Sequence, residues 1–221
     1  MSPFSCSFLG FIAALLSFTL SLSAVEYPLC CLGPDALLER GTPSEWIVTH
    51  KKVEDRHVLP REFSMRDADN ASFPEIPLGH RPTAIVFFYT RCTNPNKCPA
   101  LMSRFAGLRG RLDEQGLKDR VDMLAISYDA YRERPEDLLK YADGLGPTAQ
   151  GIHLLVPEPD EAKRLFRAWS IRGQTSAVGV AAHTNELFLL DREGRLYQHH
   201  EVYLWNDNQV ISVLQTLADE P

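Results

Sequence analysis

The sequence lacks the features that mark several large classes of protein. No run rich in Lys and Arg occurs and the net charge is -6, so the charge pattern does not indicate nucleic-acid binding. No phosphate-binding glycine loop, dinucleotide fingerprint or Ser/His/Asp arrangement stands out. There is also no internal repeat and no low-complexity segment. The 221 residues therefore suit one sizeable domain together with a leader.

Long apolar runs are also scarce, and the one of interest lies at the N-terminus. Residues 8–22 are apolar or small and carry no charge, and small residues at 21–24 suit a cleavage site. This pattern predicts a signal peptide over residues 1–24. The alternative is a retained N-terminal anchor, although a membrane span needs about 20 apolar residues. We expect an exported protein of the bacterial periplasm or cell envelope, with an N-terminal extension over 25–57 and the main domain over 58–221.

Cysteine is used sparingly, with five in the whole chain. Cys6 lies in the leader, and four cysteines remain in a compartment where disulfides can persist. Cys30 and Cys31 are neighbours, and a disulfide between neighbours is strained. Free thiols, an intermolecular bridge or an extra metal site are the alternatives for that pair. Cys92 and Cys98 have a different setting, because they directly follow a buried strand.

The hydrophobic periodicity alternates between strands and helices. Alternating strands and helices indicate parallel pairing and a three-layer α/β sandwich, and a terminal hairpin followed by a helix is typical of thioredoxin-like proteins. We therefore predict a thioredoxin-like sandwich with a central mixed β-sheet and an N-terminal β-hairpin. The expected elements are a hairpin near 61–75, strands at 84–89, 121–127 and 152–156, helices at 101–112, 135–145 and 162–169, a hairpin over 186–199 and a helix at 210–217.

Cys92 and Cys98 lie where α/β folds place their chemistry, at the carboxyl end of a buried strand. The helix that follows offers a partial positive charge at its N-terminus, which stabilises thiolates, and Arg91 and Lys97 add to it. Three uses are open for this pair: soft-metal ligands, a redox-active pair or a structural disulfide. The residues between the two cysteines form a polar, exposed turn that a disulfide would do little to stabilise. This disfavours a structural disulfide.

His183 is the second piece of the predicted site. It lies in a loop at 180–185, just before the penultimate strand, and in a thioredoxin-like fold that loop packs against the cysteine loop. Thiol-exchange enzymes normally place a cis-proline there, whereas residues 174–185 contain no proline. Two thiolates and one imidazole suit Cu(I) or Cu(II).

Other histidines and the tryptophans carry weaker signals. His199 and His200 end a strand, where successive side chains point to opposite faces, so both cannot easily bind one metal ion. We expect a solvated pair. Trp169 and Trp205 stand at helical positions and are expected to be core residues.

Three segments of the sequence resemble the SCO/SenC family of copper-binding proteins, which help to assemble the copper centre of cytochrome c oxidase. They are residues 87–99, residues 125–141, and His183 with residues 189–195. The resemblance runs from about Leu59 to Leu217, nearly the whole domain.

The resemblance implies that Cys92, Cys98 and His183 are copper ligands. The sequence departs from the family pattern in its cysteine spacing, with five intervening residues in place of the usual three. Asp129 and Glu133 stand at the acidic positions of the family's second segment, and we assign Asp129 at most a supporting or structural role.

The leading functional hypothesis is therefore a copper-binding assembly factor rather than an enzyme. It would pass copper to the copper-accepting subunit of a respiratory oxidase or to another copper protein, and other copper carriers or thiol reductases are further expected partners. It would be soluble or attached to the membrane by its N-terminus. The alternatives are a thiol–disulfide oxidoreductase that uses Cys92 and Cys98 to reduce a partner's cysteines, and a redox or copper sensor.

Overall fold

The computed structural model describes residues 47–76, 78, 80–201 and 205–221. The predicted leader, most of the N-terminal extension and the pair Cys30 and Cys31 lie outside the described residues. Within the described residues, none of the helices is both long enough and apolar enough to cross a bilayer.

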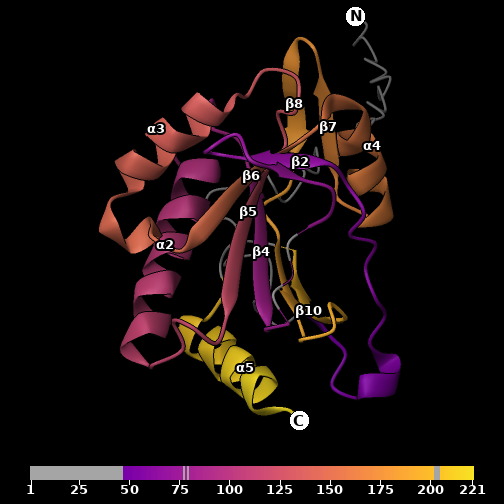
Figure 1. Cartoon of the computed structure of the whole chain (residues 1–221), viewed down its shortest axis with the longest axis vertical. Helices are drawn as coiled ribbons and strands as arrows, with labels where there is room; N and C mark the ends of the chain where they lie inside the picture. Colours follow the sequence, from indigo (N-terminus) through magenta and orange to yellow (C-terminus); the bar gives the residue numbers. More distant parts are fainter. Residues whose placement is uncertain (1–46, 77, 79, 202–204) are drawn as a thin grey trace, which may run out of the picture.

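A mixed sheet forms the centre of the domain (Figure 1). It has eight strands in the order β1-β10-β9-β4-β5-β6-β2-β3. The three middle strands β4, β5 and β6 are parallel, and every other pairing is antiparallel. The bounds are β1 Ile47–Thr49, β2 Met65–Asp67, β3 Ser72–Phe73, β4 Thr83–Phe88, β5 Asp122–Ser127, β6 Ile152–Pro157, β9 Leu187–Leu190 and β10 Leu196–His200.

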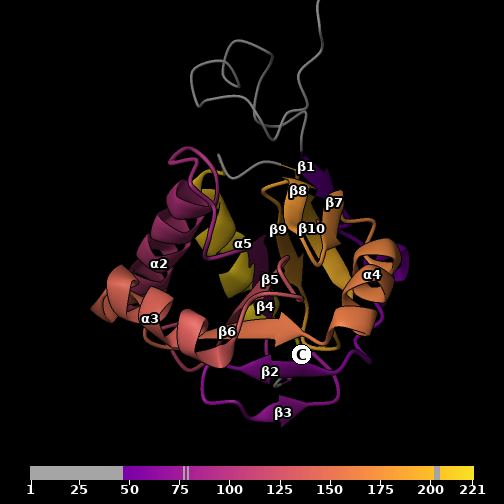
Figure 2. The ribbon, with the colours of Figure 1, turned by 90° about the horizontal axis from the view of Figure 1, so that it is seen from above.

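Helices cover both faces of this sheet (Figure 2). On one face, α2 (Cys98–Glu114), α3 (Pro135–Leu145) and α5 (Asp207–Asp219) enclose one hydrophobic cluster, and on the other α4 (Pro159–Ala168) encloses a second. All six residues of β4 are buried, as expected for a strand with apolar neighbours on both faces. The predicted three-layer α/β sandwich, thioredoxin-like and with a mixed sheet and an N-terminal hairpin (β2–β3), is confirmed.

The helices begin where the sequence places proline. Pro135 and Pro159 are the first residues of α3 and α4, and Pro99 is the second residue of α2. Proline suits the first turn because its missing N–H would have no intrahelical partner there. Trp169 and Trp205 are buried, as predicted.

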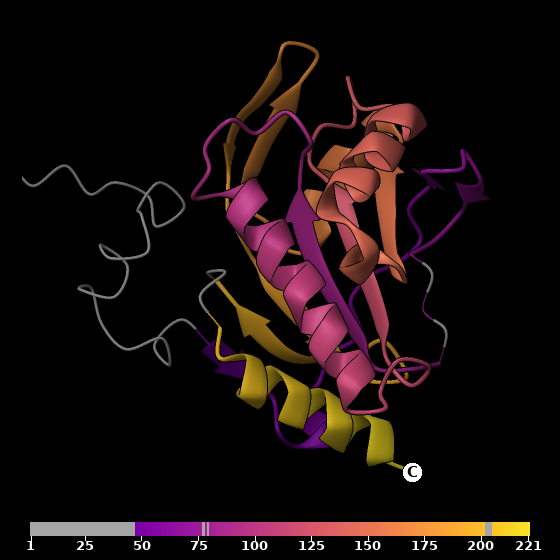
Figure 3. The ribbon, with the colours of Figure 1, turned by 90° about the vertical axis from the view of Figure 1, so that its left-hand side faces the viewer.

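A small hairpin of β7 (Gly173–Ser176) and β8 (Gly179–His183) stands outside the main sheet. The sequence interpretation placed His183 in a loop, which is wrong, because His183 ends β8. The hairpin escaped detection because most of its side chains are exposed and give no apolar alternation. It projects from the end of the sheet at which β4 leads into α2 (Figures 1 and 3).

The N-terminal edge strand β1 fixes where the chain enters the domain. Ile47 pairs with His200, His200 pairs with Leu187, and Leu187 pairs with Val86 near the end of β4. Ile47 therefore lies toward the end of the sheet that carries the cysteine loop. The N-terminal extension thus contributes one edge strand, β1, to the sheet.

Candidate metal centre

The two cysteines lie near opposite ends of the connection between β4 and α2. Cys98 is the first residue of α2 and is fully buried, while Cys92 is 8% exposed. Most of the residues between them are exposed and form a turn. Its hydrogen bonds run from the Lys97 N–H to the Asn94 carbonyl (3.1 Å) and from the Asn96 N–H to the Asn94 side-chain oxygen (3.0 Å). The longer loop thus bulges into solvent between two cysteines that remain buried.

His183 completes the group from the end of β8. Its Nε2 atom lies 3.9 Å from the Cys92 sulfur and 3.8 Å from the Cys98 sulfur. All three donor atoms lie within 4.8 Å of one another, and all three residues are buried. Bonds of about 2.1 Å to nitrogen and 2.3 Å to sulfur allow two donors on one ion to lie up to about 4.4 Å apart, and both sulfur–nitrogen distances meet that limit. The three predicted ligands are therefore brought together, and the group could hold one metal ion.

The imidazole of His183 is held in the orientation and tautomer that a metal ligand needs. Its Nδ1 donates a hydrogen bond to the Thr184 carbonyl (3.1 Å), which can only accept. The proton therefore sits on Nδ1, and the Nε2 lone pair faces the two sulfurs. The Tyr128 hydroxyl donates to the same carbonyl (2.9 Å), and the rings of Tyr89 and Tyr128 pack against the imidazole at centroid distances of 5.2 and 5.3 Å.

The two thiols differ in acidity. A hydrogen bond from Cys98 outweighs the effect of burial and lowers the pKa of the Cys92 thiol far below its usual range. Burial, followed by the hydrogen bond to Cys92, raises the pKa of the Cys98 thiol. Near neutral pH the reduced pair therefore holds one proton, and that proton resides on Cys98. A metal ion bound to both sulfurs must displace it, so binding is coupled to proton release.

Two acids after β5 support this arrangement. Asp129 is fully buried and accepts hydrogen bonds of 2.6 and 2.9 Å from Arg132 at one oxygen. Arg132 also donates to the Val178 carbonyl at the tip of the β7–β8 hairpin (3.1 Å). Asp129 thus acts on the hairpin through Arg132, in line with the structural role expected for it. Glu133 accepts a hydrogen bond from the Thr90 N–H at the start of the cysteine loop, and burial raises the pKa of its carboxyl group.

Tyr89, Tyr128 and Thr184 are the residues of the site that the sequence analysis did not single out. Tyr128 directly follows β5, at the same edge of the sheet as the residues that follow β4. That position after a buried parallel strand was the available signal. Thr184 contributes a backbone carbonyl, which no side-chain pattern reveals.

His199 and His200 are not a solvated pair, contrary to expectation. His200 is 2% exposed, and its Nε2 donates to the Gln198 side-chain oxygen (2.9 Å). His199 stacks on Phe188 and donates from Nε2 to the buried carboxylate of Glu186 (3.0 Å). The sequence could not show this because β10 lies between β1 and β9, which cover both of its edges. Neither histidine belongs to the Cys–His group.

Comparisons with solved structures support the fold. A SCO1/SenC family lipoprotein from Bacillus anthracis aligns with a TM-score of 0.66 at 18% identity, over 76% of this chain and 100% of the other. ScoI from Arabidopsis thaliana, solved with copper bound, aligns with a TM-score of 0.61 at 18% identity, over 74% and 100%. ScoI from Bradyrhizobium japonicum, also with copper bound, gives a TM-score of 0.57 at 21% identity, over 73% and 99%.

Two sequence comparisons gave different results. A comparison with curated proteins yields no match. The family model described as SCO1/SenC, in contrast, matches residues 51–219, which include every strand and helix from η3 (Val53–Asp55) to α5. This match spans well over half of the sequence, and the chain therefore belongs to the SCO1/SenC family.

Proposed function

We propose that this protein is a copper-binding assembly factor that holds one copper ion through Cys92, Cys98 and His183. The observation that carries the proposal is the convergence of two sulfurs and one imidazole nitrogen within 4.8 Å in a buried setting. Thiolate and imidazole ligands favour copper among the common metals that use such groups. The copper-bound ScoI structures from Arabidopsis thaliana and Bradyrhizobium japonicum, which share the fold, support the choice of metal.

The recipient in this proposal is the copper-accepting subunit of a respiratory oxidase or a related copper protein. A structural relative, BsSco, is described as a member of the Sco family of cytochrome c oxidase assembly proteins, and it aligns with a TM-score of 0.65. The proposed place of action is the cell envelope, reached through the leader over residues 1–24. Other copper carriers would load the site, and thiol reductases would keep the cysteines reduced.

Release of the ion follows from the unequal thiols. Ligands of the recipient would replace those of this chain one at a time, with Cys92 as the more exposed of the two sulfurs. Cys98 has a raised pKa and takes up a proton when it loses the metal. Reprotonation of Cys98 therefore favours departure of the ion, and the two cysteines must be reduced for the next one to bind.

The test is a Cu(I) titration of the reduced protein against a competing chelator. Wild-type protein should bind one Cu(I) tightly, and His183→Ala should weaken binding by at least about tenfold, which corresponds to about 1.4 kcal/mol. The matched control is His153→Ala, because His153 lies on an exposed position of β6. Weak binding that is indifferent to His183 would contradict the proposal.

A second candidate function is supported by the same pair of free thiols. The Cys92 thiolate would attack a disulfide of a partner, and Cys98 would then attack the mixed disulfide, so the partner leaves as a dithiol and this chain is oxidised. The two functions separate cleanly by mutation. Disulfide exchange requires that Cys92→Ser is inactive and that His183→Ala is nearly silent, whereas copper transfer requires that His183→Ala is impaired.

A further inference from the structure

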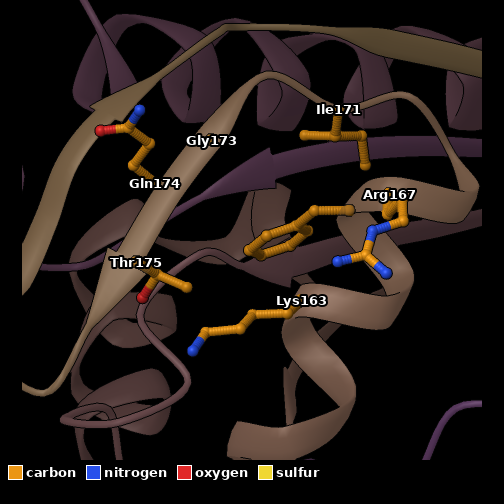
Figure 4. Close-up of a pocket in the computed structure, with 7 residues that line it drawn as sticks. Lys163, Arg167, Ile171, Gly173, Gln174 and Thr175 are labelled. Carbon is orange, nitrogen blue, oxygen red and sulfur yellow. The ribbon is translucent and has the colours of Figure 1, made fainter.

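A cavity lies between α4 and the β7 strand, and none of its lining residues is a ligand of the proposed copper site (Figure 4). Its volume is about 350 Å³, and its apolar part is made by Phe166 and Ile171. Gly173 forms part of the wall, where a Cβ atom would lie only 3.0 Å from the Tyr128 ring. Small-molecule sites in proteins have volumes of roughly 300–1,000 Å³, so this cavity suits a small ligand.

Two cations on α4 line the cavity, and no acidic residue does. Lys163 and Arg167 are one helical turn apart, a spacing at which like charges repel. Neither forms an ion pair with any acid that the structure describes, in contrast to Arg164 on the same helix, which pairs with Glu161. Both side chains are exposed, so the mouth of the cavity carries positive charge with no acid among its lining residues, which suits an anion.

A hydroxyl group adds a third polar contact. The Thr175 oxygen is buried and has no hydrogen-bond partner among the described residues. A buried polar group without a partner is unfavourable, so a ligand that pairs with it gains from doing so. In Figure 4 this oxygen lies on the same side of the cavity as the Lys163 amino group, while the Gln174 amide points away from both.

We propose that this cavity is a binding site for a small organic carboxylate with an aryl or alkyl body. The carboxylate would accept charge-assisted hydrogen bonds from Lys163 and Arg167 and a hydrogen bond from Thr175. The apolar body would rest on Phe166 and Ile171, a contact that an inorganic anion cannot make. The chemistry of the walls thus selects an organic anion.

The cavity is connected to the metal centre through residues that pack against both, although none of the three proposed metal ligands lines the cavity. Gly173 pairs with His183 across the hairpin. The rings of Phe166 and Tyr128 pack together with a centroid distance of 5.4 Å, and the Tyr128 ring packs against the imidazole of His183 with a centroid distance of 5.3 Å. The amides of β7 are therefore sensitive reporters of a ligand that enters the cavity.

The test is a titration of the reduced, metal-free protein with phenylacetate, followed by amide chemical shifts in NMR spectra. We expect saturable shifts of the Gln174 and Thr175 amides with a dissociation constant of about 1 mM or tighter. Benzylamine, a cation of similar shape, should cause none. Inorganic phosphate should bind about tenfold more weakly, since it lacks the apolar body.

Variants test which groups are responsible. Arg167→Gln should weaken phenylacetate binding about tenfold, whereas Lys140→Gln removes an exposed charge on α3 and should leave it unchanged. Thr175→Val should weaken binding without lowering the unfolding free energy, because it removes an unpartnered hydroxyl group. The proposal is overturned by the absence of saturable shifts, by equal binding in Arg167→Gln and Lys140→Gln, or by phosphate binding as tightly as phenylacetate.

Discussion

At the scale of single residues, the metal centre depends on where two protons reside. One is on Cys98, whose burial raises the pKa of its thiol, and the other is on Nδ1 of His183, opposite the Thr184 carbonyl. With the protons in these places, the Cys92 sulfur and the Nε2 nitrogen both offer lone pairs to an incoming ion. The centre is therefore prepared for a metal ion before one arrives, and only one proton must leave.

This distribution of protons predicts the effect of Cys98→Ala on Cys92. Removing the hydrogen bond from Cys98 takes away the largest cause of the low pKa, so the pKa of the Cys92 thiol should rise. In the reduced, metal-free protein, alkylation of Cys92 by iodoacetamide should be pH-independent from neutral to mildly acidic pH, and in the variant it should slow as the pH falls. Mass spectrometry of the Cys92 peptide separates its reaction from those of the other cysteines.

The matched control is Ser103→Ala on an exposed position of α2, which should retain the wild-type pH profile of Cys92. If Cys98→Ala also retains the wild-type profile, the thiol pair does not share a proton in the manner described.

The sequence predicted which residues form the metal centre, but it did not predict the contacts that orient them. Resemblance to the family singled out Cys92, Cys98 and His183, and the described structure brings their donor atoms together. The tautomer of His183 depends on a carbonyl and on the Tyr128 hydroxyl, which come from separate segments of the chain. Such contacts arise only from tertiary packing and leave no local pattern in the sequence.

At the scale of elements, the β7–β8 hairpin determines where His183 stands. The hairpin is not part of the main sheet. Arg132 donates a hydrogen bond to its tip and is itself paired with the buried Asp129. No apolar alternation marks its strands, so periodicity could not predict it, whereas the buried strand β4 was predicted within one residue at each end. Elements stabilised by tertiary hydrogen bonds rather than by burial are the ones that periodicity misses.

Gly179 offers a test of this hairpin. Its φ is +136°, and a Cβ atom there would lie 2.7 Å from the Arg132 guanidinium. Gly179→Ala should therefore strain the backbone by about 1–3 kcal/mol and displace Arg132 from Val178. We expect faster amide hydrogen exchange in β7 and β8 than in wild-type protein, unchanged exchange in β4, and weaker Cu(I) binding in chelator competition.

Gly107→Ala is the matched control, because no atom lies within 4 Å of a Cβ placed at Gly107 in α2. That substitution should raise the unfolding free energy by about 0.5–1 kcal/mol and leave Cu(I) binding unchanged. Unaltered exchange in β7 and β8 of Gly179→Ala would show that Arg132 does not hold the hairpin.

At the scale of the whole molecule, the sandwich buries groups that the sequence suggested would be solvated. The alternation of strands and helices was sufficient to predict the layers, because the strands of the parallel centre are mostly apolar. Hydrophobic periodicity could not predict the pairing of β1 with β10, because residues 25–57 show no clear period. This edge pairing is one reason that His200 is enclosed rather than solvated.

The burial of His200 predicts a pH dependence of global stability. Burial, and then the charge of His199, lowers the pKa of His200 to about 4, from an ordinary value near 6.5. Between these values the unfolded chain takes up a proton that the folded chain does not, so the unfolding free energy falls as the pH is lowered. The contribution is at most about 1.4 kcal/mol per pH unit.

Urea denaturation of the reduced, metal-free protein at pH 7 and pH 5 measures this loss. His200→Gln should lose less stability over the interval than wild-type protein, whereas His153→Gln, at an exposed position, should lose as much. Equal losses in wild-type protein and His200→Gln would contradict the assignment.

The position of the edge strand β1 also determines whether Cys31 can react with the cysteine loop of the same chain. Ile47 enters the sheet toward its cysteine end, and Cys31 lies 16 positions before it. Sixteen residues span at most about 53–58 Å when extended, whereas a domain of this size has a radius of gyration of about 16 Å. The extended tether is thus longer than this radius, which is long enough for Cys31 to reach the cysteine loop. Once Cys92 and Cys98 have formed a disulfide, attack of the Cys31 thiolate on Cys92 would release Cys98 as the leaving thiolate. This exchange would be a first-order process, with a rate that does not change when the protein is diluted.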